Sequence, residues 1–160
     1  MTLPHGQLVF EDVEAGQEVD ALVKGPLGTM HLMRWSAAME NWHRIHYDRT
    51  FAQEHDKLPD ILINGSLKQQ FILQCLKDWA GRAGWVWKVG FQFRAMNLVD
   101  ETLTVWARVK ATRDVGPYGL VELELGIRNG AGTESTPGTA TVALPHRGGA
   151  PVPYPFRAPA

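Results

Sequence analysis

The densest group of side chains that could take part in chemistry lies in one short run, residues 40–48. The run holds two histidines, His43 and His46, together with carboxylates, an asparagine and a tyrosine. An imidazole titrates near neutral pH, so it can hold or activate water and move a proton. The run therefore predicts either acid–base chemistry or a metal site that uses the two histidines.

A metal site has less support than acid–base chemistry. Zinc sites take three or four converging ligands, and no further partner for His43 and His46 follows at a familiar spacing. We therefore expect no metal and no other cofactor. The single cysteine, Cys75, falls within an apolar helical pattern, which favours a small buried side chain over a nucleophile and leaves no internal disulfide.

A long helix must follow this run. Apolar residues recur every three or four positions over residues 67–79, which predicts a helix buried on more than one side. Asn64 and Ser66 are alternative caps for its first amides, and Gln69 stands where a capping box would place it. We expect the helix to stop at one of the next two glycines.

Alternation of apolar and polar residues predicts strands in the rest of the chain. One short strand precedes the histidine run, and turn residues separate the last strands, so those strands are expected to pair antiparallel through hairpins. The predicted strands lie at residues 18–24, 87–93, 103–109, 121–127 and 140–144.

The order of these elements indicates the fold class. A strand, an irregular helical segment, one long buried helix and four strands are segregated along the chain, which is typical of an α+β domain. A twisted sheet with one apolar face can curl around a helix this apolar. We therefore predict the hot-dog fold, an antiparallel sheet wrapped around one long central helix.

The length of 160 residues suits one domain, predicted over residues 1–146. The remainder, 147–160, is rich in proline and glycine and is expected to run extended over the surface. Tyr154 and Phe156 could anchor it to this subunit or a neighbour.

Composition narrows the classes of partner. Hydrophobic residues make up 44% and charged residues 21% of the chain, and the formal net charge is -1, so we expect no nucleic-acid partner. No apolar run approaches the roughly 20 residues that a bilayer helix needs, and residues 1–6 lack the features of a signal peptide. A cytoplasmic protein without a membrane partner is the expectation.

Two motifs carry a resemblance to a known family. Residues 41–48 read Asn-Trp-His-Arg-Ile-His-Tyr-Asp, and residues 62–67 read Leu-Ile-Asn-Gly-Ser-Leu. Both resemble motifs of the MaoC-like dehydratases and (R)-specific enoyl-CoA hydratases, in the branch that includes 3-hydroxyacyl-thioester dehydratases type 2 and mesaconyl-CoA hydratases. The resemblance extends over about residues 8–145.

The resemblance implies that water is added to, or removed from, the 2,3-double bond of an acyl thioester carried by CoA or acyl carrier protein. His46, at the family's histidine position, is the expected general acid and base. Gly65 N–H, at a helix N-terminus, is the expected donor to the thioester oxygen when negative charge develops there. Asn64 and Ser66, which flank this glycine, are expected to bind substrate.

Asn41 departs from the usual pattern, because most of these hydratases carry an aspartate at this position. An asparagine can orient water but cannot accept a proton. His46 therefore acts alone, or Glu40, His43, Asp48 or another subunit supplies the second group. The branch with this octapeptide shows the same asparagine.

The remaining residues of the run have binding or structural roles. His43, Trp42 and Tyr47 are expected to contact substrate, the two aromatic rings as part of an apolar wall. Asp48 is expected to fix Arg44 or to cap a short helix that begins next to it.

Hot-dog proteins typically dimerise by joining their sheets, so a homodimer or higher oligomer is expected, or a heteromer with a second hot-dog chain. Two alternative functions remain open. One is thioester hydrolysis, for which the long helix offers only Asp78, far from its N-terminus. The other is a non-catalytic acyl-CoA-binding subunit, in which Asn41 marks the missing proton acceptor.

Overall fold

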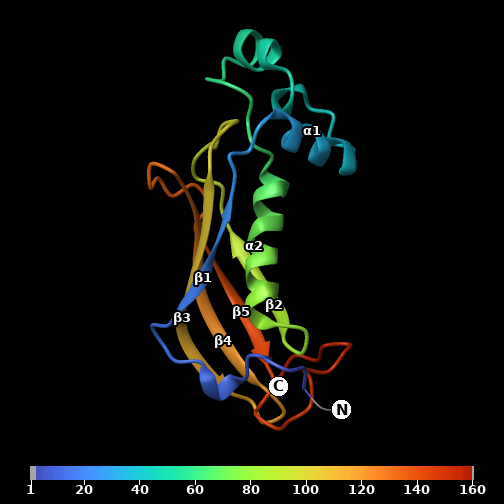
Figure 1. Ribbon diagram of the computed structural model, residues 1–160, viewed down its shortest axis with the longest axis vertical. Helices are drawn as coiled ribbons and strands as arrows, with labels where there is room; N and C mark the ends of the chain where they lie inside the picture. The colour runs from blue at the N-terminus through green and yellow to red at the C-terminus, as the bar shows by residue number, and fades with distance from the viewer. Residues whose placement is uncertain (1–2, 160) are drawn as a thin grey trace.

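A five-stranded antiparallel sheet curls around one long helix, α2 (Gly65–Ala80), in the computed structural model of the protein, which describes residues 3–159 (Figure 1). Neighbouring strands follow the order β1-β3-β4-β5-β2. This is the hot-dog fold, so the predicted fold class is confirmed. The strands are β1 (Glu18–Lys24), β2 (Trp85–Phe91), β3 (Leu103–Asp114), β4 (Gly119–Asn129) and β5 (Gly138–Leu144).

The last three strands pair in sequence, as their turn residues predict, but β2 does not pair with the strand that follows it. It lies beside β5, so β1 and β2 form the two edges of the sheet. The connection between β2 and β3 is not a tight turn, because its backbone forms hydrogen bonds with other parts of the chain. Arg94 N donates to Ser135 O (2.9 Å), and Leu98 forms a β-bridge with Leu62. A hairpin between β2 and β3 is thereby ruled out.

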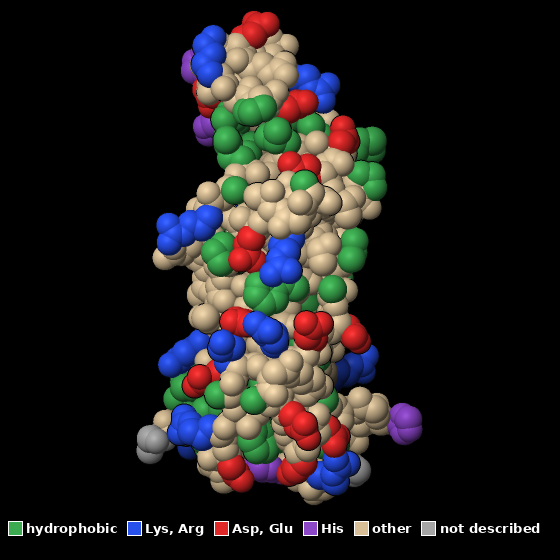
Figure 2. All heavy atoms as spheres, turned by 90° about the vertical axis from the view of Figure 1, so that its left-hand side faces the viewer, with side chains coloured by type: hydrophobic (Ala, Val, Ile, Leu, Met, Phe, Trp, Pro, Cys, Tyr) green, Lys and Arg blue, Asp and Glu red, His purple; other side chains and the backbone are tan. Residues whose placement is uncertain are grey.

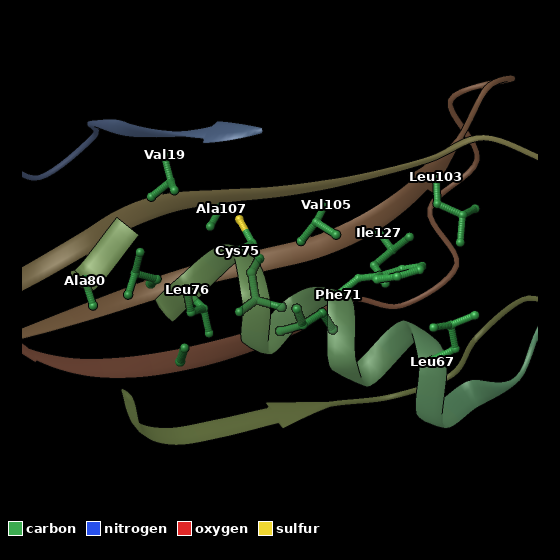
Figure 3. Close-up of a cluster of buried hydrophobic side chains, with 14 of the residues drawn as sticks. Val19, Leu67, Phe71, Cys75, Leu76, Ala80, Leu103, Val105, Ala107 and Ile127 are labelled. Carbon is green, nitrogen blue, oxygen red and sulfur yellow. The ribbon is translucent and has the colours of Figure 1, made fainter. Parts of the chain in front are cut away.

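The core lies between α2 and the concave face of the sheet. Ile72 and Leu76 are 0% and 1% exposed, and Figure 3 shows side chains of α2 directed at those of β3 and β4. Burial of a side chain of this size contributes on the order of 2 kcal/mol. Cys75 belongs to this core, as its apolar surroundings predict, and burial raises the pKa of its thiol.

The alternation predicted for β2 breaks at Trp87. The register with β5 shifts between Val86 and Lys88, and a shift of one residue moves a side chain to the other face. Trp87 therefore packs on the outer side, against Phe156 of the C-terminal segment. Tyr118 Oη donates to Arg157 O (2.6 Å) at the same place.

The irregular helical segment predicted before α2 consists of three helical pieces above its N-terminal end (Figure 1). Asp48 performs both predicted structural roles there, because its carboxylate accepts from Arg44 Nε (3.1 Å) and from Phe51 N (3.0 Å). The three pieces are the helix α1 (Thr29–Ala38), a 3-10 turn (Arg44–His46) and a π-helical turn (Phe51–His55).

The outer face of the sheet, opposite α2, carries side chains of both charges interspersed (Figure 2). Glu124 on β4, for example, pairs with Arg108 and Lys110 on β3. None of the helices in the described part of the chain is long and apolar enough to cross a membrane.

Candidate functional site

The site is built on the short segment that leads into α2, residues 61–63. On one side, Leu62 N donates to Ile45 O (2.9 Å) in the histidine run. On the other side, Ile63 N donates to Asn97 O (2.8 Å) in the β2–β3 connection. Because both neighbours hold this backbone, the histidine run and the first residues of α2 have fixed positions relative to each other.

His46 is the buried histidine of the run, with 8% of its surface exposed. Its Nδ1 lies 2.7 Å from Leu62 O, and because a carbonyl only accepts, this contact places the proton on Nδ1. The Nε2 lone pair is then available to take a proton. The pKa of His46 is lowered, mainly by burial. The hydrogen bond to Leu62 O raises it in part, and the nearby His43 lowers it. The neutral, basic form is favoured near neutral pH.

Gly65 is the first residue of α2, and among the described residues none accepts a hydrogen bond from its N–H. The ring of Phe93 lies across its Cα, since a Cβ added there would stand 2.9 Å from Phe93 Cε2 and Cζ. Phe93 itself is 52% exposed. The free amide at the positive end of the helix therefore has an aromatic neighbour on one side.

Asn64 and Ser66 do not cap α2 with their side chains, so the predicted capping box is wrong. Their side chains bond to α1 instead: Asn64 Nδ2 donates to Ser36 Oγ (3.1 Å), and Ser66 Oγ accepts from Trp35 Nε1 (2.8 Å). These bonds hold α1 against the start of α2. Asn64 Oδ1 is buried without a hydrogen-bond partner among the described residues.

The other predicted residues of the histidine run are half-buried or exposed. Asn41 Oδ1 accepts from His43 N (3.3 Å), which is a local turn, and Tyr47 Oη donates to Trp42 O (2.7 Å). The ring of His43 is exposed and lies 6.2 Å from that of His46. The Trp42 side chain is 60% exposed and forms no closed wall in the monomer. Substrate contact at these positions stays a prediction.

Lys68, in the first turn of α2, is a buried charged residue near Gly65 that the sequence analysis missed. It is 3% exposed, and its Nζ lies 3.0 Å from Asn97 Oδ1 and 4.9 Å from the centroid of the Phe93 ring. Asn97 Nδ2 in turn donates to Glu101 Oε2 (2.9 Å). Burial lowers the pKa of Lys68 to about 8, with Glu101 acting in the opposite direction.

A sequence signal for Lys68 exists. A lysine four residues before Ile72 falls on the apolar stripe of the predicted helix, where a charged residue must find partners when it is buried. No group of three or more histidine, cysteine or acidic side chains within residues 3–159 is arranged to hold a metal ion.

A comparison with protein families matches residues 14–101, more than half of the chain, to the hydroxyacyl-thioester dehydratases type 2. The chain belongs to this family. The matched range includes the histidine run, Gly65 and Lys68, and the resemblance drawn from the two sequence motifs is confirmed.

A curated relative is the mesaconyl-C(4)-CoA hydratase of Chloroflexus aurantiacus, which is 36% identical over 64 residues. The match covers 40% of this chain and 21% of the relative, so the chain spans about a fifth of that protein's length.

Solved structures of similar shape include an (R)-hydratase from A. caviae, with a TM-score of 0.75 and 23% identity over 84% of this chain and 99% of that one. An (R)-hydratase from Pseudomonas aeruginosa has a TM-score of 0.78 and 16% identity, with 88% of both chains covered. The ChsH1–ChsH2 complex of Mycobacterium tuberculosis has a TM-score of 0.71 and 18% identity over 82% of this chain and 98% of that one. At these identities the likeness supports the fold.

Proposed function

We propose that the protein adds water to, or removes it from, the 2,3-double bond of an acyl thioester, with His46 as general acid and base and Gly65 N–H as donor to the thioester oxygen. The observation that carries the proposal is the hydrogen bond from His46 Nδ1 to Leu62 O, 2.7 Å long. This bond supports the proposal because it leaves Nε2 as the basic nitrogen and ties the imidazole to the segment that leads into Gly65.

In the hydration direction, His46 Nε2 takes a proton from water while the water oxygen bonds to C3 of the enoyl thioester. The electron pair of the double bond moves toward the carbonyl, where Gly65 N–H stabilises the enolate oxygen. The imidazolium then returns a proton to C2, which completes the 3-hydroxyacyl product. One preorganised donor of this kind contributes on the order of 3 kcal/mol to transition-state stabilisation.

Asn64 and Asn41 fit supporting roles. Asn64 Oδ1 is buried beside Gly65 with no described partner, and a water or substrate hydroxyl would satisfy it. Asn41 can orient water by hydrogen bonding without accepting a proton, so His46 carries both proton transfers.

The acyl carrier is CoA or acyl carrier protein, and the protein acts as a homodimer or as a heteromer with a second hot-dog chain. The free edge of β2 supports association, because it presents unpaired backbone groups together with the side chain of Trp85, which is 37% exposed.

The test compares His46→Gln with the unaltered protein on crotonyl-CoA, followed by the loss of enoyl-thioester absorbance. We expect the rate to fall on the order of 10²-fold or more, because glutamine cannot transfer the proton. The matched control is His55→Gln, at an exposed histidine paired with Asp56 outside the site. An unchanged rate in His46→Gln would refute the proposal.

Asn41 favours a second function, a non-catalytic acyl-thioester-binding subunit that a partner chain completes. This function predicts binding of crotonyl-CoA without turnover until the second chain is added. Thioester hydrolysis has no comparable support, because Asp78 lies thirteen residues after Gly65, roughly 20 Å along the helix axis.

A further inference from the structure

A groove lies between α1, α2 and the end of β1, with a volume of about 790 Å³. We call it the basic groove. Its size falls within the roughly 300–1,000 Å³ typical of small-molecule sites. Its principal lining residues are Lys24, His31, Arg34, Trp35, Leu67 and Phe71.

The walls of the basic groove combine two cationic side chains, Lys24 and Arg34, with apolar surface. Lys24, His31 and Arg34 line it, and none of the described residues in its lining is acidic. No carboxylate of the described chain forms an ion pair with any of these three side chains. An amphipathic anion would complement the groove.

The basic groove adjoins the candidate site. Trp35, in its wall, donates from Nε1 to Ser66 Oγ (2.8 Å), and Ser66 directly follows Gly65. The groove runs along α2 from Leu67, two residues after Gly65, to Phe71, which lies four residues or about 6 Å further along the helix axis. At that end, Lys24 Nζ lies 5.8 Å from the centroid of the Phe71 ring. A ligand that reaches from the Gly65 amide into the groove would meet its cations away from the reacting carbons.

We propose that the basic groove binds the nucleotide end of coenzyme A, which makes CoA the acyl carrier of this protein; this inference rests on the proposed function. The adenine packs against the indole of Trp35 and neighbouring apolar side chains. The diphosphate and the ribose 3′-phosphate pair with Lys24 and Arg34, and a ring N–H of His31 donates a hydrogen bond to them. An acyl tail would fill the apolar wall but leave Lys24 and Arg34 without anionic partners.

The first experiment tests binding without catalysis. Adenosine 3′,5′-bisphosphate is titrated into the full chain by calorimetry, and into Arg34→Glu and Lys24→Glu. We expect the unaltered protein to bind, with affinity that falls as salt rises, and each variant to bind at least about tenfold more weakly. The charge-matched control is Arg113→Glu, on β3 and outside the groove, which should bind as the unaltered protein does. Equal affinity in Arg34→Glu would overturn the proposal.

The second experiment tests whether Arg34 acts on the nucleotide end of the substrate. Crotonyl-CoA is compared with crotonyl-N-acetylcysteamine, which has the same thioester and no nucleotide. We expect Arg34→Glu to raise KM for crotonyl-CoA at least about tenfold with kcat unchanged, and to leave turnover of the truncated thioester unaltered. An equal effect on both thioesters contradicts the proposal. The proposal would also be wrong if Arg34→Glu raised KM for crotonyl-acyl carrier protein while the unaltered protein did not bind the bisphosphate. The groove would then recognise a protein carrier.

The two experiments separate this inference from the proposed function. If the protein turns over neither thioester, the proposed function fails, while the bisphosphate titration still decides whether the groove binds the nucleotide.

Discussion

The buried lysine at the start of α2 makes the stability of the protein depend on pH in a direction that can be measured. Lys68 is 3% exposed, and burial lowers its pKa from 10.5 to about 8. Between these two values the unfolded chain binds more protons at this position than the folded chain. The free energy of unfolding must therefore rise with pH across this window.

The size of this effect follows from the two pKa values. Between pH 7 and pH 10 the contribution of Lys68 to the free energy of unfolding increases by about 2.5 kcal/mol, as an upper bound. Urea unfolding at several pH values in this range measures it, with Lys68→Met as the reference. The methionine fills a similar volume and does not titrate, so all other titrations cancel in the difference.

We expect the difference in unfolding free energy between the unaltered protein and Lys68→Met to grow in favour of the lysine as pH rises. A difference that stays constant from pH 7 to pH 10 would show that Lys68 keeps an ordinary pKa in the folded protein. The assigned cause, burial of the ammonium group against Asn97 and Phe93, would then be wrong.

Three further predictions concern the site and the core. Since burial lowers the pKa of His46 below 6.5, kcat/KM for hydration should fall on the acid side with a midpoint below that value, and a midpoint above it would contradict the assignment of the basic form. Gly65→Ala should abolish most of the activity, because the new methyl group screens the amide from the substrate. The loss of stability should be small, because the exposed Phe93 ring can turn away from the methyl group. Recovery of activity in the double variant with Phe93→Ala would instead attribute the loss to the displaced ring. Ile72→Ala, at a side chain with 0% exposure, should lower the free energy of unfolding by about 3 kcal/mol in denaturant titrations, and a loss below about 1 kcal/mol would show that the core collapses around it.

Local patterns in the sequence predicted most of the elements. The three- and four-residue spacing predicted α2, and alternation predicted the strands, because each pattern reflects which face of one element is buried. The turn residues predicted the β3–β4 and β4–β5 hairpins for the same local reason. The assignment of His46 and Gly65 to the candidate site came from motifs, which carry no information on the distance between the two residues.

Only the tertiary structure decided how these elements meet, because the deciding contacts join residues far apart in the chain. It placed β2 beside β5, and it moved Trp87 to the outer face through a one-residue shift. It directed the side chains of Asn64 and Ser66 to α1 instead of the helix amides. The partners of Lys68 and the position of Phe93 over Gly65 also depend on the packing of the β2–β3 connection against α2, which no periodicity within either segment records.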